Sequence, residues 1–263
     1  ISMSEPDAGT ALTDLKTRAR IEGDEIVING TKRWCSGAGH SGGYVVFCRF
    51  DDSEGARGIG AVFVELGTRG FSFGEQEELM GFRGVPSADM FLDEVRVPKS
   101  HVLVGAGGFG KLMGLFNIER LGNATMALGV AAGALEQVVE YVKERRQFGR
   151  PVADFQAVQL RLADMAMKVE ASRLLIHRAA AGAADGLPDP AQAAMAKCFA
   201  NQITREVCAD AMQLMGGYGY AREFGMERRL RDSYGWGIAG GSIDIQKVNI
   251  AAALTGHRSR QRG

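Results

Sequence analysis

The sequence predicts an α+β fold, in which an antiparallel, barrel-like β domain is followed by a C-terminal four-helix bundle. Two patterns lead to this prediction. Up to about residue 104, apolar residues alternate in short runs that turn residues separate, which is the period of half-buried strands. From Gly107 onward, apolar residues recur at helical spacing in long segments with short connections, as in antiparallel bundles. We therefore expect two domains, residues 1–104 and 105–263.

The first domain is expected to form one strand at each alternating run. Residues 25–30 end in Asn29-Gly30, a pair that favours a tight hairpin turn. Residues 44–48 and 59–64 are two further runs of this kind. Residues 89–98 should form the last strand, because Pro98 has no N–H group with which to continue the ladder.

The second domain is expected to contain five helices. Pro151 separates the first two, Gly186 and Pro188 end the second, and Gly216-Gly217 ends the third. The expected helices are residues 112–144, 155–184, 190–215, 226–234 and 243–255. Residues 257–263 form a short basic tail, which we expect to be frayed.

Composition and charge argue against several classes of protein. The chain of 263 residues is 46% hydrophobic and 24% charged, as expected for a globular protein, and its net charge is zero. A nucleic-acid surface would need a basic excess, and no apolar run is long enough to span a membrane. The cysteines form no CxxC pair and have no histidine at zinc-ligand spacing, so we expect reduced thiols and no metal site. They are Cys35, Cys48, Cys198 and Cys208.

Five short blocks follow one another in a fixed order. They are Ser4–Thr10 (SEPDAGT), Lys32–Ser36 (KRWCS), Glu144–Gly149 (ERRQFG), Gln213–Gly219 (QLMGGYG), and Arg231-Asp232 leading to Gly240-Gly241-Ser242. Together, and in a β-then-helix context, they resemble the acyl-CoA dehydrogenases over nearly all of the chain. The family fold has an N-terminal helical domain, a middle β domain and a C-terminal four-helix bundle, and this sequence resembles the last two. The chain begins at Ile1 without a recognisable targeting segment, so we expect a part of a longer protein.

The resemblance implies a function and its partners. We expect FAD as cofactor, an acyl-CoA thioester as substrate, and electron transfer to an electron-transferring flavoprotein. The expected reaction is α,β-dehydrogenation of the thioester, in fatty acid or branched-chain catabolism. The resemblance also implies a homotetramer that is a dimer of dimers, located in a bacterial-like cytoplasm or a mitochondrial matrix.

Several residues can be assigned to the flavin and the substrate. The N–H groups of Ala8-Gly9-Thr10 suit a phosphate or a flavin edge, although a simple turn explains the loop equally well. Trp34 and Ser36 would share one face of a strand, unless Trp34 is a core residue. The resemblance implies that the following residues bind FAD: Met3, Ser4, Trp34, Ser36, Arg145, Gln147, Gln213, Gly216, Gly217, Ser242 and Asp244. It implies substrate contacts for Thr10, Asn117, Arg120 and Gly241.

Basic residues at the end of a helix need no special role, so Arg145 has a plain structural explanation as well. The resemblance instead implies that Arg145 and Gln147 reach an FAD bound largely to a neighbouring subunit. The family usually has Ser-Asp where this chain has Thr10-Ala11, which changes the polar groups of that loop but not its backbone.

The catalytic base is expected to be Glu119. Many family members carry the base as the glutamate of a Tyr-Glu-Gly-Thr turn, but the matching stretch here is Ala239–Ser242 and the glutamate position is Gly240. A branch that includes isovaleryl-CoA and long-chain acyl-CoA dehydrogenases carries it on the first bundle helix instead, where this chain has Asn117-Ile118-Glu119-Arg120. Gly240 would still offer its N–H to the thioester carbonyl. The alternative is that Glu119 pairs with Arg120 or a neighbouring helix as a solvated charge.

Other functions within and beyond this fold remain open. An acyl-CoA oxidase or an enoyl-CoA reductase would have the same fold, and only the reactivity of the flavin separates them. A non-catalytic flavin-binding homologue should have lost both possible bases, whereas Glu119 is present. A nucleic-acid-associated member is disfavoured by the neutral charge. Because Gly240 leaves room near the substrate, a branched or bulky acyl group is expected.

Overall fold

The computed structural model describes residues 1–50, 52 and 55–257, and it divides into two compact units, Ile1–Gly114 and Leu115–Gly263. The first unit is dominated by β-strands and the second by helices, so the predicted α+β class is confirmed. The predicted basic tail lies, apart from His257, outside the described residues. None of the described helices has an apolar stretch long enough to cross a bilayer.

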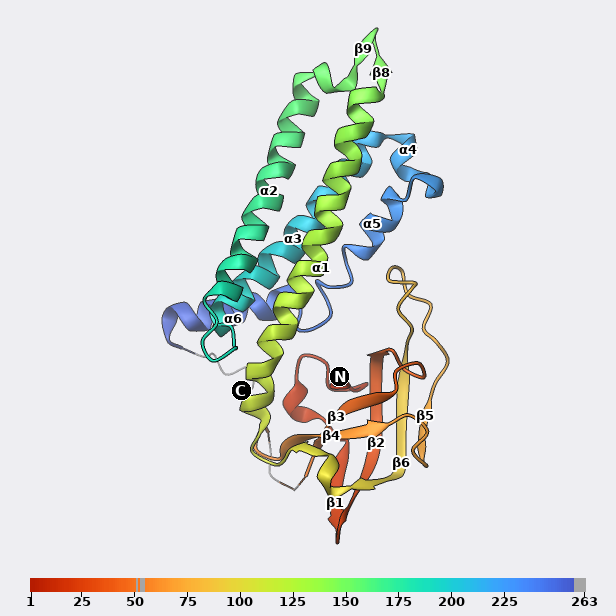
Figure 1. Ribbon diagram of the computed structural model, residues 1–263, viewed down its shortest axis with the longest axis vertical. Coiled ribbons are helices and arrows are strands. Elements are labelled where there is room, and N and C mark those ends of the chain that lie inside the picture. Colours follow the sequence, from red (N-terminus) through yellow and green to blue (C-terminus); the bar gives the residue numbers. More distant parts are fainter. Residues whose placement is uncertain (51, 53–54, 258–263) are drawn as a thin grey trace. The chain divides into compact units, whose positions relative to one another are not determined.

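One seven-stranded sheet forms the first unit (Figure 1). Its strand order is β5-β6-β2-β1-β3-β4-β7, and every pairing is antiparallel except the short parallel contact of β1 with β3. Within the described residues, the edge strands β5 and β7 do not pair with each other, so the sheet is barrel-like but open. The strands are β1 Arg18–Glu22, β2 Glu25–Ser36, β3 Gly43–Arg49, β4 Ile59–Glu65, β5 Phe71–Phe73, β6 Ser87–Pro98 and β7 Val102–Val104.

Two predictions about the strands were wrong. The hairpin turn lies at Gly23-Asp24, because β1 pairs with β2 up to Glu22 opposite Glu25. Asn29-Gly30 instead lies in the middle of β2 at a β-bulge, where a Cβ on Gly30 would come within 2.7 Å of the Thr17 Cα atom. Glycine is therefore required by this close approach and not by a turn. The strand β7 follows β6, and three residues are too few to show an alternating pattern.

The first unit has two apolar clusters. One is formed by side chains of the sheet such as Ile28, Val46 and Met90, all of which are fully buried. The other contains Ala8, Leu15, Phe47, Ile59, Ala61 and Leu112, with Phe109 and Met113 packed against it. The last three residues belong to the beginning of helix α1, so this helix starts as part of the β unit.

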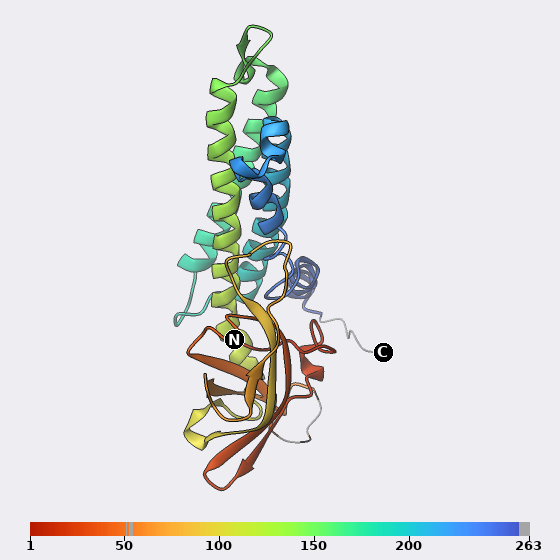
Figure 2. The ribbon, with the colours of Figure 1, turned by 90° about the vertical axis from the view of Figure 1, so that its right-hand side faces the viewer.

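Three long helices lie side by side in the second unit (Figures 1 and 2). They are α1 Phe109–Glu144, α2 Gln156–Ala181 and α3 Pro190–Met215. The short helices α5 Met226–Asp232 and α6 Ile243–Thr255 both pack against α3. The remaining elements are α4 Gly217–Tyr220, the 3-10 turns η1 Leu12–Asp14, η2 Lys99–His101, η3 Val152–Asp154 and η4 Arg222–Phe224, and a hairpin of β8 Arg146–Gln147 with β9 Arg150–Pro151.

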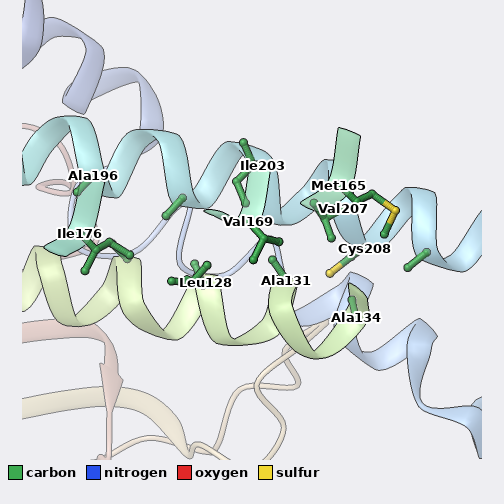
Figure 3. Close-up of a cluster of buried hydrophobic side chains, with 14 of the residues drawn as sticks. Leu128, Ala131, Ala134, Met165, Val169, Ile176, Ala196, Ile203, Val207 and Cys208 are labelled. Carbon is green, nitrogen blue, oxygen red and sulfur yellow. The ribbon is translucent and has the colours of Figure 1, made fainter. Parts of the chain in front are cut away.

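The core of the second unit lies between α1, α2 and α3 (Figure 3). Small residues such as Ala131 and Ala134 on α1 belong to the same buried cluster as larger ones such as Met165 and Val169 on α2. Helix α3 begins at a well-formed cap, since the Asp189 side chain accepts a hydrogen bond from the N–H of Gln192 at 2.9 Å. The periodic segments predicted from the sequence therefore correspond to real helices, with ends that differ by a few residues.

Candidate active site

The N-terminal segment is fixed against the sheet. The N–H of Ser2 donates to the Val45 carbonyl at 2.8 Å, and the N–H of Phe47 donates to the Ser2 carbonyl at 3.0 Å. The N–H of Arg33 donates to the Ser4 carbonyl at 2.9 Å. Met3 and Ser4, two predicted flavin contacts, are thus held in place by β2 and β3 through backbone hydrogen bonds.

A buried ion pair between Lys32 and Glu5 also holds this N-terminal segment in place. Lys32 is 0% exposed, and its Nζ donates to Glu5 Oε1 at 2.7 Å and to the Met3 carbonyl at 3.2 Å. The Glu5 carboxylate also accepts the N–H groups of Lys16 at 2.6 Å and Thr17 at 3.0 Å. Burial raises the pKa of Glu5, but the Lys32 charge and these hydrogen bonds outweigh it, so the pKa is lowered and Glu5 is ionised.

The loop after Glu5 leaves two amides free. Ala8 uses its N–H to bond the Glu5 carbonyl at 3.1 Å, whereas the N–H groups of Gly9 and Thr10 donate to no described atom. Both residues are exposed, and nothing lies within 4 Å of a Cβ placed on Gly9. Adjacent unsatisfied amides of this kind suit an anionic or carbonyl oxygen.

Trp34 is presented outward in a strained conformation. Its φ is +60°, which is unusual for a bulky residue, and it lies where the β2–β6 register shifts. Its side chain is 53% exposed, so the alternative that it fills the core was wrong. The Arg33 guanidinium lies 4.2 Å from the ring centroid and is itself held by Asp89 at 2.5 Å. Ser36 is also exposed, whereas the intervening Cys35 is buried.

In the helical unit, Glu119 has an unpaired carboxylate. The Arg120 guanidinium turns instead to Asn117, whose Oδ1 accepts its Nη1 donor at 2.6 Å. Glu119 is exposed and makes no hydrogen bond or ion pair with any described residue. Among the described residues, Glu119 therefore forms no ion pair with Arg120 or with a neighbouring helix. Burial lowers the pKa of Arg120, and Asn117 is almost fully buried.

The turn Ala239–Ser242 has a conformation that favours glycine. The φ angles are +66° at Gly240 and +87° at Gly241, and in the described chain neither N–H donates to any atom. A Cβ at position 240 would lie 3.4 Å from Asn123 Nδ2 and 3.7 Å from Lys197 Nζ. Gly240 thus offers a free backbone donor beside an α1 side chain and an α3 side chain.

Lys197 is a site residue that the sequence analysis missed. Its Nζ donates to the Ala239 carbonyl at 2.6 Å and to the Gly241 carbonyl, and the residue is 1% exposed. Burial, followed by the charge of Arg120, lowers the pKa of Lys197 to about 7. The interaction with Arg120 places the predicted α1 residues and the late turn in one neighbourhood. A lysine in an alanine-rich helix gives no signal in the sequence that it is buried.

A hollow of about 470 Å³ lies beside the start of α6 and is lined by basic, acidic, polar and apolar residues, the acidic ones being Glu206 and Asp244. It contains two predicted FAD residues, Ser242 and Asp244, and two basic residues, Arg205 and Lys247. The Nε of Arg205 is buried without a partner among the described atoms, and Gly237 makes room for the guanidinium, since a Cβ there would lie 2.3 Å from Nη2. The basic side chains of Arg205 and Lys247 suit a phosphate.

The other predicted FAD residues of this unit lie at the opposite end of α3, near the β8–β9 hairpin (Figure 1). Arg145 lies 5.4 Å from the centroid of the Tyr218 ring, which brings the third and fourth sequence blocks together. Helix α1 ends at Glu144, so Gln147 lies in the hairpin and not in a last helical turn. The exposed residues Gln213, Gly216 and Gly217 follow at the end of α3. From Lys197 to Gln213, α3 rises by roughly 24 Å.

Comparison with known proteins finds a matching family model for each unit. Residues 1–95 match the family described as acyl-CoA dehydrogenase, middle domain, and residues 106–255 match acyl-CoA dehydrogenase, C-terminal domain. The chain is 40% identical over 255 residues to the probable acyl-CoA dehydrogenase fadE25 of Mycobacterium leprae, covering 96% of this chain and 66% of the relative. It is 38% identical over 254 residues to the caffeyl-CoA reductase-Etf complex subunit CarC of Acetobacterium woodii, covering 96% and 67%.

A solved structure agrees with these matches. Butyryl-CoA dehydrogenase from Megasphaera elsdenii superposes with a TM-score of 0.93 at 36% identity, covering 97% of this chain and 67% of that one. The chain therefore spans about two thirds of the length of the relatives that it matches.

Proposed function

Because the chain belongs to the acyl-CoA dehydrogenase family, we propose that the whole protein dehydrogenates an acyl-CoA thioester with Glu119 as the catalytic base. The observation that carries the proposal is a pairing of two positions. Position 240 is a glycine with a free N–H, and Glu119 on α1 has a carboxylate that no described residue neutralises. A carboxylate that is free of partners is available to accept a proton.

The residues present fit FAD in both units. In the first, the free amides of Gly9 and Thr10 and the exposed ring of Trp34 provide donors and a flat surface. In the second, the hollow with Arg205 and Ser242 provides groups that suit a pyrophosphate. Met3, Ser4, Ser36 and Asp244 complete the proposed contacts. Bound FAD would accept the β-hydrogen of the substrate as a hydride.

Two groups of this chain would act on the acyl group. The N–H of Gly240 would donate to the thioester carbonyl oxygen, which makes the α-proton more acidic. Glu119 would then accept that proton. The buried Asn117 fixes the Arg120 guanidinium through the 2.6 Å hydrogen bond and so holds this charge near the substrate's approach, and Thr10 and Gly241 are the other proposed substrate contacts.

The distribution of FAD residues supports a shared cofactor. Ser242 and Asp244 lie at one end of the helical unit, whereas Arg145, Gln147, Gln213, Gly216 and Gly217 lie at the other. One dinucleotide held at the first end would be distant from the second end of the same chain, so the second set would serve the cofactor of another copy. We propose a homo-oligomer on this ground, with a dimer of dimers as the expected form.

The electron acceptor and the substrate are parts of the same proposal. An electron-transferring flavoprotein is the proposed acceptor, and a relative named as the subunit of an Etf complex supports it. A branched or bulky acyl group is the proposed substrate class, because Gly240 has no side chain beside the substrate. The location, bacterial-like cytoplasm or mitochondrial matrix, stays a prediction.

The deciding experiment is Glu119→Gln in the full-length protein. We expect the variant to keep FAD, seen as its visible absorbance, while a panel of acyl-CoA thioesters reduces the flavin about 1,000-fold more slowly without oxygen. Glu136→Gln, on an exposed position of the same helix, is the matched control and should behave as wild type. Flavin bleaching by Glu119→Gln at a near wild-type rate would rule out this base.

A second variant tests the relocation of the base. Gly240→Glu in a Glu119→Gly background should restore part of the activity, because it returns a carboxylate to the other position used in the family. The restored rate should stay below wild type, since the φ of +66° strains any side chain and Lys197 Nζ lies close by. Rapid reoxidation of the reduced flavin by oxygen would indicate an oxidase, and reduction of enoyl-CoA thioesters in preference would indicate a reductase.

A further inference from the structure

We infer that Lys197 is a positioning residue, which holds the two carbonyls on either side of Gly240 and thereby aims the Gly240 N–H at the acyl carbonyl oxygen. The inference rests on the proposed function, because it assigns a role within the same reaction. Lys197 would act through the turn and not by touching the substrate.

The turn at Gly240 and Gly241 has no side chains of its own that could fix its conformation. Gly240 and Gly241 both have positive φ and lack side chains, and glycine is the residue that loses most conformational freedom on folding. The direction of the Gly240 N–H is therefore set from outside the turn. Lys197 Nζ donates to the Ala239 carbonyl at 2.6 Å and to the Gly241 carbonyl, so it fixes the planar peptide group that contains this N–H and the peptide group that follows Gly241.

A buried polar network connects Lys197 on α3 with α1 and α6. The Gln246 Nε2, from α6, donates to the Gly241 carbonyl at 3.0 Å and gives that oxygen a second donor. The Asn201 Nδ2 donates to the Lys197 carbonyl at 2.8 Å and to Asn123 Oδ1 on α1 at 3.1 Å. All four side chains are buried. The network joins the α1 segment that carries the proposed base to the turn that carries the proposed carbonyl donor.

The burial of Lys197 is not explained by charge pairing. No described carboxylate forms an ion pair with it, and the nearby charge, Arg120, has the same sign. Burying a cation without a counterion opposes folding. An amine that has lost its proton still has two N–H donors, which match the two carbonyls that it contacts. Lys197 is retained although its burial opposes folding, and it binds the turn that carries the proposed carbonyl donor. This combination points to a functional role for the side chain.

The test is Lys197→Met in the full-length, FAD-bound protein, with Lys197→Arg as the conservative variant. We expect the Lys197→Met variant to retain bound FAD and an unchanged KM for the acyl-CoA substrate, and its kcat to be roughly 10- to 100-fold lower. Lys197→Arg should recover part of the loss because it can still donate to carbonyls. Thr204→Val is the matched control, since Thr204 is also buried on α3 and donates to a carbonyl of α1, the Ala127 oxygen at 3.0 Å.

A spectroscopic measurement separates positioning from stability. A conjugated aryl-acryloyl-CoA should absorb at longer wavelength when a donor polarises its carbonyl oxygen. Wild type and Thr204→Val should produce this shift on binding, and Lys197→Met should bind the thioester with a smaller shift. If Lys197→Met does not fold, Gln246→Met removes the other donor to the Gly241 carbonyl and should give a smaller change of the same kind.

The two proposals fail in different ways. A wild-type protein whose flavin no acyl-CoA reduces would overturn the proposed function. An active wild type, with a full kcat and a full spectral shift in Lys197→Met, would overturn only the role of Lys197. If Lys197→Met does not fold, the same result in Gln246→Met would overturn it. Loss of kcat in Lys197→Met with an undiminished shift would also overturn it, because the carbonyl would still be polarised.

Discussion

Two buried lysines, one in each unit, hold backbone carbonyls next to a predicted ligand site, yet their surroundings differ. Lys32 is 0% exposed and Lys197 is 1% exposed. Lys32 donates to the Met3 carbonyl and to the ionised Glu5, whereas Lys197 donates only to carbonyls and lies near the positive Arg120. Burial lowers the pKa of both, but Glu5 opposes this shift at Lys32 and no carboxylate pairs with Lys197.

The difference shows two ways of fixing a loop. In the β unit, a paired charge stabilises the segment through an ion pair that is complete without any ligand. In the helical unit, an unpaired amine fixes a glycine turn at some cost to folding. We therefore expect Lys32 to be mainly a folding residue and Lys197 to be mainly a residue of the site. Four measurements test this contrast.

The largest effect is expected for Lys32→Met. It leaves the Glu5 carboxylate buried without its counterion, and breaking a buried pair in this way costs ~3–5 kcal/mol. Urea unfolding followed by circular dichroism would measure it. Adding Glu5→Gln should recover part of the loss, since it removes the unpaired charge and its amide oxygen can still accept one of the two N–H groups, that of Lys16 or that of Thr17. A loss below about 1 kcal/mol in the single variant would show that the pair matters little.

The second effect concerns pH and Lys197. Its pKa of about 7 lies below the ordinary value of 10.5, so the folded state binds this proton less tightly than the unfolded state. The cost of burying the charge is present in full below pH 7 and fades as pH rises toward 10.5. Between pH 6 and pH 9, wild type should gain ~3 kcal/mol of unfolding free energy relative to Lys197→Met.

Unfolding midpoints at pH 6, 7.5 and 9 would measure this difference. Thr204→Val, which removes no ionisable group, should keep a constant difference from wild type over the same range. A Lys197→Met difference that is equally constant would show that the lysine keeps its charge when buried.

A smaller effect is expected for Gly240→Ala. The φ of +66° is unfavourable for alanine by about 1 kcal/mol, and its Cβ would lie 3.4 Å from Asn123 Nδ2. Gly122→Ala is the control, because Gly122 is inside α1 with open space around it, and alanine there should stabilise the helix by about 0.5–1 kcal/mol. Thermal unfolding of both variants would compare them, and equal shifts would argue against a strained turn.

The smallest effect is expected for Asp7→Asn. Asp7 and Lys16 form an ion pair of 2.8 Å beside the buried Glu5, but their side chains are 73% and 74% exposed. Solvent and salt screen such a pair, so the unfolding midpoint should not change measurably. A clear loss of stability would mean that the exposed pair assists the buried one, and the contrast between the lysines would then need to include it.

Periodicity was sufficient to predict the fold class and the long helices. The apolar spacing of α1, α2 and α3 follows from packing on one face, and local capping at Asp189 and Gly216 determines where α3 begins and ends. Asn29-Gly30 misled the prediction because glycine serves turns and close backbone approaches alike. The three-residue β7 depends on its partner β4 and has no pattern of its own.

The candidate site was readable only in part. That residue 119 is a glutamate and residue 240 a glycine can be read directly from the sequence. Their assignment as base and carbonyl donor stays a prediction. The burial of Lys197 and the outward Trp34 depend on tertiary contacts, which no local pattern encodes. The free N–H of Gly240 likewise depends on the positive φ of the turn and on hydrogen bonds that arrive from α3 and α6.

Helix α1 has a consequence for cutting the protein into fragments. The predicted domain boundary is at residue 104, but Leu112 covers part of the cluster formed by Ala8, Phe47 and Ile59. A fragment that stops at Val104 would leave these apolar groups facing water, and such a patch promotes aggregation. A fragment that stops at Gly114 keeps the cover but ends within the helix, with carbonyls that no later residue satisfies. The first residues of α1, up to Gly114, thus complete the apolar core of the first unit, and the same helix continues into the second unit.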